Sequence, residues 1–549
     1  MIEKVSVVNL NKRQNTPSTS TDKQTSFSGL GDGFIQAIQW CEKYPMLNVS
    51  VLDLSTAIIP RTAVETKEAN AYAGFEAFRR ESSGLIVNCL LPGFIVLGLS
   101  RILQGTIMGD FKNSKGIYGS WANSDSLDKI QKYYTEAKGE GRDKVKNMFT
   151  NMFNDLEGVD GDVSKDGLKD FSKLYSKHSE DFDKHLNTLV DEIMKDKPNN
   201  KVVKKAIADI INTTHISENI RFKGDKEFFT TSFDSLYKSA VKMTNGIRKE
   251  GLTTIPDVAK YISRAKKLVK VKSLAGLGIV IPLAISMQPL NRWITSKHSG
   301  KKGAPIYKDY IESEHKELTS DEKSKLLKQK FVSIGSMIGV AILSMMKLPS
   351  MKVLEFKGLF PSMDQARIIS TATFASRMAT SEDRNELRES TIRDIATFSG
   401  LYFLGDYAAK AIATGIEKFN KDIHLVNKLK PVKPDAGTLS KFWHWVKNTS
   451  LKSSDELRSA KERRLRTVCQ LGNLAFSLLA LGIFIPELYK AQTNRKRQQE
   501  LEKQAQVDNK SNKSNNTSTK VMSDKYVYDI MDADMSTPFK SFFSSQRIK

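Results

Sequence analysis

Four long runs without a charged residue stand out in the pattern of apolar and polar positions along the chain. They cover residues 84–100, 273–291, 331–346 and 467–486. A helix rises about 1.5 Å per residue and the hydrocarbon layer of a bilayer is about 30 Å thick, so a full span needs roughly twenty residues. The pattern predicts membrane-spanning helices at the first, second and fourth runs. The run at 331–346 is a marginal span that has to thin the bilayer.

The four runs differ in detail. The run at 467–486 is the strongest candidate, because it has twenty uncharged residues and basic residues on both sides. In the second run, Pro282 and Pro289 predict an interrupted helix, and Trp293 beyond it is a residue type that anchors in the headgroup layer. Burial of all four runs inside a large soluble protein is the alternative, although core helices usually carry shorter apolar runs.

Helical periodicity also marks the segments outside these runs. Residues 62–81 place apolar side chains on one face, and the polar block at 105–260 repeats helical patterns that glycine and asparagine clusters interrupt. Few windows alternate β-branched residues, so a substantial sheet is not expected. Helix starts are predicted by three pairs with capping-box spacing, Thr319–Glu322, Ser362–Gln365 and Thr380–Asp383.

Together these patterns predict a mainly α-helical, multi-helix integral membrane protein with an inserted helical soluble domain and disordered termini. The two ends are rich in Ser, Thr, Asn, Gln and Lys, a composition that is too polar to build a core. The predicted segments are a disordered leader at 1–30, amphipathic helices and the first membrane helix at 31–104, the polar helical domain at 105–260, two apolar helices with a connecting loop at 261–350, a helical region at 351–440, an aromatic cluster and the last membrane helix at 441–497, and a disordered tail at 498–549.

The charge distribution changes what the apolar runs imply about partners. Lys and Arg number 85 against 62 Asp and Glu, a formal charge of +23, but residues 257–302 alone hold ten basic residues against one acidic. Anionic headgroups attract such flanks at about 1 kcal/mol per residue, so lipids are the predicted partner and nucleic acid is not. A solvated basic face without a partner is the alternative. The predicted headgroup contacts are Lys266, Lys267, Lys270, Lys272, Arg463, Arg464, Arg466, Arg495, Lys496 and Arg497.

The cysteines and the N-terminus bear on the compartment. Three cysteines in 549 residues, without metal-ligand spacing, indicate buried apolar side chains and no disulfide framework. The leader has no uninterrupted apolar stretch, so a cleaved signal peptide is not expected. The predicted location is a membrane that the chain crosses several times.

Catalytic motifs are not visible in the sequence. It has no phosphate-binding loop, dinucleotide fingerprint, zinc-protease motif or nucleophile elbow, so an enzyme is not favoured and no cofactor is predicted. The nearest metal site is a partial calcium loop, in which Asp162, Ser164, Asp166 and Asp170 occupy ligand positions. Lys173 stands where a bidentate Glu is needed, so weak Ca²⁺ binding is a hypothesis that the sequence disfavours.

Asp406 and Lys410 interrupt a stretch, residues 395–416, that is otherwise apolar enough to insert. Its apolar residues supply about −2 to −4 kcal/mol, whereas two charges near the centre cost roughly 5 to 7 kcal/mol, so this helix is not expected to insert alone. One interpretation places both charges on an ion or proton path inside a bundle. The favoured interpretation places the helix on the membrane or against the soluble domain, with its charges in water.

Three further patterns suggest contacts. Gly335 and Gly339 form a Gly-x-x-x-Gly step on which two helices can approach closely. The aromatic cluster at residues 442–445 fits either a membrane interface or a local core. The acidic and aromatic residues after 520 form either a docking peptide for a protein partner or a cap on the chain itself.

The function predicted from these features is an organisational or partner-binding role at a membrane. A transporter or channel built around Asp406, Lys410 and the proline-broken helices is the alternative. An intramembrane cavity lined by Asp406 would favour transport, and a packed apolar bundle would favour the organisational role.

Overall fold

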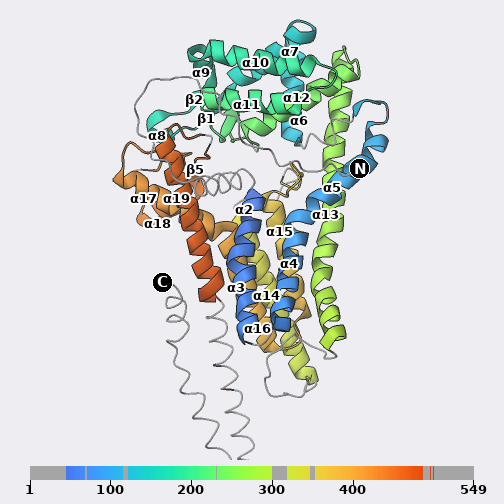
Figure 1. Cartoon of the computed structure of the whole chain (residues 1–549), viewed down its shortest axis with the longest axis vertical. Helices are drawn as coiled ribbons and strands as arrows, with labels where there is room; N and C mark the ends of the chain where they lie inside the picture. The colour runs from blue at the N-terminus through green and yellow to red at the C-terminus, as the bar shows by residue number, and fades with distance from the viewer. Residues whose placement is uncertain are drawn as a thin grey trace, which may run out of the picture. The chain divides into compact units, whose positions relative to one another are not determined.

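The computed structural model describes residues 45–68, 71–114, 122–229, 231–299, 318–345, 353–433, 435–454 and 456–485, together with the single residues 495 and 499. The described chain is mainly helical, with two small sheets (Figure 1). The predicted leader at 1–30 and tail at 498–549, including its docking segment, lie outside the described ranges apart from residue 499.

Among the described residues, four helices are long and apolar enough to cross a membrane, and each contains most or all of one predicted run. They span Ala71–Met108, Ile255–His298, Ser320–Met345 and Ala460–Phe484. The first consists of α4 (Ala71–Leu85), a short π-helix η2 (Ile86–Leu90) and α5 (Leu91–Met108), and the others are α13 (Ile255–Ser299), α14 (Ser320–Met345), and α19 (Ala460–Ser477) with the π-helix η5 (Leu478–Phe484). The prediction of long apolar helices at these positions is confirmed.

Helix α13 is continuous, contrary to the expectation that prolines interrupt it. It runs for 45 residues with Pro282 and Pro289 inside it, a length of about 68 Å. Pro289 cannot donate a hydrogen bond to the carbonyl of Ile285. The Ser376 hydroxyl of a neighbouring helix donates to that carbonyl instead, at 2.5 Å, so a side chain repairs the gap that the proline leaves.

A polar helical region with its own core lies between α5 and α13 in sequence. Its interior is formed by aromatic and aliphatic residues from about Met108 to Val269. The elements of this region are α6 (Ser124–Glu136), α7 (Gly141–Asn154), β1 (Leu156–Gly158), α8 (Val163–Asp166), β2 (Lys169–Asp170), α9 (Phe171–Lys177), α10 (Ser179–Met194), α11 (Asn200–Thr214), β3 (Ile220–Phe222) and α12 (Phe233–Lys249). The strands form one small antiparallel sheet in the order β2-β1-β3.

Helices α5 and α13 connect this region to the apolar bundle. They pack along each other, and both contribute to two cores (Figure 1). In α13, residues 258–269 belong to the core of the polar region, whereas Leu277, Val280 and Ala284 belong to a core of the bundle. The polar region is therefore carried on a two-helix stem rather than on a flexible linker.

The rest of the bundle is built from helices before and after these elements. Its N-terminal part is α2 (Pro45–Leu52), the π-helix η1 (Asp53–Ile58) and α3 (Ile59–Glu68), and its later part is α15 (Met363–Thr380), α16 (Arg384–Ser399), the π-helix η4 (Gly400–Leu404) and α17 (Gly405–Phe419). The final small elements are β4 (Val426–Lys428), α18 (Thr438–Asn448) and β5 (Thr449–Leu451), with β4 and β5 antiparallel.

Local capping follows the predicted spacing at two of the three helix starts. Ser362 and Gln365 form a complete capping box at α15, and the Thr319 and Glu322 groups bond reciprocally before α14. The third prediction is wrong in its residue: Asp383 itself caps α16, because its carboxylate accepts from two backbone N–H groups of the first turn. The Thr380 hydroxyl bonds within α15 instead.

Close helix packing depends on glycines at a few crossings. A Cβ at Gly93 of α5 would overlap the carbonyl of Leu359, and one at Gly276 of α13 would overlap Val96 of α5. These crossings bring the loop before α15 and the stem helices into direct contact. The backbone of the same loop is held to α13, where Phe356 N donates to Ser273 Oγ at 2.9 Å.

Candidate functional site

A group of buried or nearly buried charged side chains lies where four bundle helices meet. It consists of Arg61 (α3), Glu81 (α4), Arg377 (α15), and Arg393 and Asp394 (α16), and we call it the bundle network. Arg377 bridges two carboxylates, at 2.7 Å to Asp394 and 3.6 Å to Glu81. Only 1% of the Asp394 side chain is exposed, so this carboxylate depends on Arg377 and Arg393 for its stability.

Polar side chains extend the bundle network to further helices. Arg61 Nη2 donates to the Thr397 hydroxyl of α16 at 2.7 Å. The amide oxygen of Gln288 on α13 accepts from Arg377 Nη2 at 3.1 Å when the amide is oriented to satisfy both groups. Gln288 lies just before the end of the run at 273–291, and Glu81 lies just before the start of the run at 84–100. The bundle network therefore lies near one end of these apolar runs.

The helical spacing of α15 explains why it faces the network with polar groups. Ser370, Thr373 and Arg377 occur at i, i+3 and i+7, which places them on one stripe of the helix. Thr373 Oγ1 donates to Asn88 Oδ1 at 2.8 Å, and the hydroxyls of Ser370 and Tyr402 lie 2.6 Å apart. These pairs satisfy polar atoms that would otherwise be left unbonded in the bundle.

A small cavity of about 30 Å³ adjoins the network. That volume is enough for a water molecule but not for an organic substrate. Three of the π-helices contribute to its lining, with Asp53 from η1, Asn88 and Cys89 from η2, and Leu401 and Tyr402 from η4. Short π-helical segments frequently occur at functional sites, because the extra residue redirects side chains.

Asp53 is the acidic residue that lines the cavity together with Glu81. It accepts no hydrogen bond from any residue that the structure describes. Burial raises the pKa of Asp53 to about 7, while Arg61 and Arg377 oppose this increase and Glu81 adds to it. Asp53 therefore changes its protonation near neutral pH. The charged groups that act on its pKa, Arg61, Glu81 and Arg377, all belong to the bundle network.

The arrangement can hold a proton, a water molecule and a set of fixed charges, and it has no visible metal chemistry. Within the described ranges, no group of three or more His, Cys, Asp and Glu side chains could hold a metal ion. The sequence pattern did not reveal this site, because its members are spread from residue 53 to residue 402. The polar stripe on α15 was the signal that could have pointed to it.

Asp406 and Lys410, the predicted ion-path residues, do not form an ion pair. Lys410 Nζ lies within 3.1–3.5 Å of the carbonyls of Trp445, Val446 and Thr449, and it therefore caps the C-terminal end of α18. Burial lowers the pKa of Lys410 to about 8, so the ammonium form dominates at pH 7. Asp406 is exposed and does not line the cavity near Asp53.

The predicted calcium ligands are engaged as helix caps. Asp162 accepts from the backbone N–H of Ser164 and pairs with Lys428 at 3.1 Å. Asp170 accepts from the backbone N–H of Ser172 and pairs with Lys223 at 2.9 Å. These contacts use the carboxylates in other ways, so Ca²⁺ binding stays a prediction without structural support.

The predicted glycine step on α14 faces open space. No described atom lies within 4 Å of the position that a Cβ would take at Gly335 or at Gly339. This differs from Gly93 and Gly276, which the fold already uses for internal contacts. Self-association through the step stays a prediction.

The predicted headgroup residues divide into exposed and buried groups. Lys267, Lys270, Arg463, Arg464 and Arg495 are exposed, whereas Lys266 is partly covered and pairs with Asp128 at 2.5 Å. The prediction of headgroup contact is wrong for Lys272 and Arg466, because both side chains are buried and Arg466 Nε donates to the carbonyl of Lys452. Lys496 and Arg497 lie outside the described residues.

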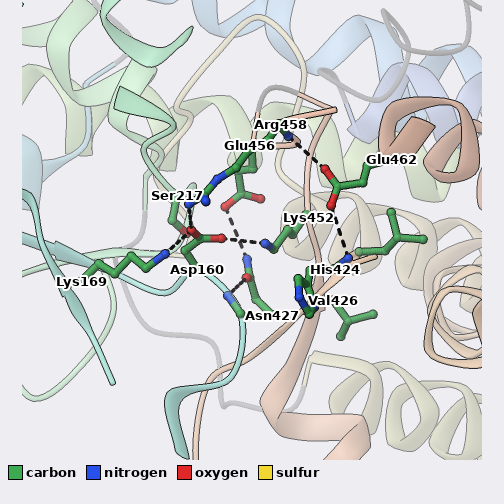
Figure 2. A network of polar contacts seen from close by, with 12 residues as sticks. Asp160, Lys169, Ser217, His424, Val426, Asn427, Lys452, Glu456, Arg458 and Glu462 are labelled. Carbon is green, nitrogen blue, oxygen red and sulfur yellow. Dashed lines mark hydrogen bonds and ion pairs between the residues drawn. The ribbon is translucent and has the colours of Figure 1, made fainter. Parts of the chain in front are cut away.

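A second charge network joins the polar region to the C-terminal elements, and Figure 2 shows it. We call it the junction network. Asp160 accepts from Lys169 at 2.5 Å, Lys452 at 2.7 Å and Arg458 at 2.5 Å. Burial acts to raise the pKa of Asp160, but Lys452 and Lys169 outweigh it and hold the pKa well below its usual value.

Backbone and carboxylate contacts reinforce the junction. Asn427 of β4 is fully buried, and its Oδ1 accepts from Gly161 N at 2.9 Å. The Glu456 carboxylate accepts from the backbone N–H groups of Glu218 and Ser453, both at 2.8 Å. The junction network therefore fixes the polar region to the elements that precede α19.

Comparison of the chain with protein-family models, with curated proteins and with solved structures finds no match.

Proposed function

We propose that this chain is a multi-pass membrane protein that holds its polar helical region at the membrane surface in an organisational or partner-binding role. The inverted distribution of polarity in the bundle carries this proposal. Large apolar side chains of the four long helices point outward, including Ile102, Phe331, Val332 and Leu343, all of them exposed. Charged side chains are gathered inside, which is the arrangement expected when lipid surrounds the helices.

Alkaline carbonate extraction tests membrane integration. The chain is expected to stay in the membrane pellet, whereas a peripheral protein held by its basic residues would be released. Complete release into the supernatant would overturn the proposal.

Cysteine accessibility in sealed vesicles tests whether α13 crosses the bilayer. Lys226 in the polar region and Lys297 near the other end of α13 are both exposed. Lys226→Cys and Lys297→Cys, each in a Cys41→Ser background, are expected to react with an impermeant reagent from opposite sides. Cys89 and Cys469 are buried and serve as the unreactive background. Reaction of both positions from the same side would show that α13 does not span.

The organisational role requires that the polar region or the C-terminal segment contacts a protein partner. The stem of α5 and α13 holds the polar region at a fixed position, which suits a scaffold. Removal of residues 498–549 is expected to leave membrane integration unchanged and to abolish crosslinked complexes with a protein partner. Complexes that persist without this segment would place the contact elsewhere.

Movement of protons through the bundle is the second candidate, and the cavity beside Asp53 is the observation that favours it. Asp53→Asn should lower a proton flux measured with an internal pH dye in liposomes. Asp406→Asn is the matched control, because Asp406 lies outside the cavity. An absent flux in the unmodified protein would exclude this candidate and leave the organisational role.

A further inference from the structure

Helix α18 has an apolar stripe that the described chain covers at only one end. Leu439, Phe442, Trp443 and Val446 occur at i, i+3, i+4 and i+7 and share one side of the helix. Val446 is buried, but the exposed fractions are 70% for Leu439, 53% for Phe442 and 51% for Trp443. Three large apolar side chains therefore project from a helix of eleven residues.

The opposite side of α18 is polar and basic. Lys441 is exposed on that side and His444 lies next to it, whereas the exposed Lys447 flanks the stripe one turn after Trp443. A helix with Trp, Phe and Leu on one side and Lys on the other is typical of segments that lie in the plane of a membrane interface. Exposed Arg463 and Arg464 at the start of α19 add positive charge in the same part of the chain.

The bundle holds α18 in place and determines where it lies along the apolar helices. Lys410 of α17 binds the carbonyls at the C-terminal end of α18, and Trp445 Nε1 donates to the Thr414 hydroxyl of α17 at 3.1 Å. In turn, α17 packs on the beginning of α19 (Figure 1), where Ala409 and Ala413 share a core with Cys469.

The contact between α17 and α19 lies where the charged first turns of α19 change to its uncharged run, which begins at residue 467. This contact also lies at the end of the bundle that faces the polar region, because β5 follows α18 directly and pairs with β4, which contacts Gly161. Helix α18 is therefore located at the boundary between apolar and polar surfaces.

We propose that α18 lies in the headgroup layer of the membrane, with Leu439, Phe442 and Trp443 inserted among anionic lipids. This inference rests on the proposed function, since it needs the four apolar helices to span the same bilayer. Lipid is favoured over a protein partner because basic residues surround an apolar stripe at the level where a spanning helix leaves the hydrocarbon.

Spin labels on the full chain, reconstituted in phosphatidylcholine vesicles that contain phosphatidylglycerol, test the inference. The variants Leu439→Cys and Trp443→Cys, in the Cys41→Ser background, are expected to collide with oxygen more than with a water-soluble nickel chelate. Lys441→Cys on the polar side should show the reverse. Phe442→Cys provides a second apolar position if either of the first two variants fails to fold.

A label at Leu283→Cys on α13 distinguishes failure of the inference about α18 from failure of the proposed function. Leu283 is suitable because it is exposed in the middle of an apolar run. Oxygen-rich contact at 283 together with water-like contact at 439 and 443 would overturn the inference and leave the proposed function intact. Water-like contact at 283 as well would overturn both. Immobilised spectra at 439 and 443 in every lipid composition would show that a protein or a second copy covers α18, which also overturns the inference.

Discussion

The bundle network and the junction network use the same chemistry in different surroundings. In each, a carboxylate lies between several cations: Asp394 between Arg377 and Arg393, and Asp160 among Lys169, Lys452 and Arg458. The Asp394 side chain is 1% exposed, whereas Asp160 is 18% exposed and two of its partners reach water. The difference lies in how much solvent can replace a lost partner.

The pKa values of two aspartates in these regions shift in opposite directions, because burial dominates at one and neighbouring cations dominate at the other. Burial dominates at Asp53, where no described residue donates a hydrogen bond, and its pKa rises to about 7. At Asp160 the hydrogen-bonded lysines outweigh burial, and the pKa falls below its usual value. The comparison shows that the balance between the cost of burial and the stabilisation by neighbouring cations and hydrogen bonds decides whether a buried carboxylate stays ionised.

The largest expected effect is the loss of Arg377 from the bundle network. Arg377→Met should lower the free energy of unfolding by about 3–5 kcal/mol, because it leaves Asp394 and Glu81 buried with fewer counter-charges. Unfolding in detergent micelles, followed by circular dichroism, measures this loss. The double variant Arg377→Met with Asp394→Leu should be more stable than Arg377→Met alone. A loss no larger than that of Arg458→Met at the junction would contradict the comparison.

The second effect is the pH dependence that Asp53 contributes. Because its folded pKa is raised from 3.8 to about 7, its contribution to stability is complete below about pH 4 and is lost as the pH rises through 7. The slope is at most about 1.4 kcal/mol per pH unit. Asp53→Asn should flatten the dependence between pH 5 and about pH 7 in thermal unfolding. An unchanged slope in this variant would assign the titration to another group.

A substitution at a close crossing tests how packing, without any change of charge, affects the stability of the bundle. Gly93→Ala should cost about 1–3 kcal/mol, because its Cβ overlaps the carbonyl of Leu359. Gly339→Ala is the matched control, since its Cβ meets nothing within 4 Å, and alanine favours a helix by up to about 1 kcal/mol. Chemical unfolding of both variants in the same detergent checks this contrast, and equal stabilities would show that the loop yields at Leu359.

The smallest effect is expected at the junction. Arg458→Met should lower stability by about 1 kcal/mol or less, because the Arg458 side chain is 61% exposed and Asp160 keeps Lys169 and Lys452 as partners. Added salt should reduce the difference between the variant and the unmodified chain. Since the pKa of Asp160 is lowered, its contribution is present above pH 4 and is lost as the pH falls below this value. A loss of about 4 kcal/mol or more would show that the junction is as strongly desolvated as the bundle.

The sequence by itself determined the features that depend on consecutive residues. Uncharged runs predicted four long helices, because apolar length is a property of a continuous segment. The pair Ser362 and Gln365 predicted the start of α15, because a capping box closes within one turn. The helical character of the polar block followed from its periodicity in the same way.

Tertiary structure alone decided which charged residues share a site. Asp406 and Lys410 have the spacing of a local pair, yet Lys410 binds the end of α18, and Asp406 lies outside the cavity. Arg61 and Arg377 are far apart in sequence and meet the same carboxylate of Glu81. Helical periodicity gives the side of a helix on which a residue lies, but the partner is fixed only when helices pack, because burial and distance then set the cost of an unpaired charge.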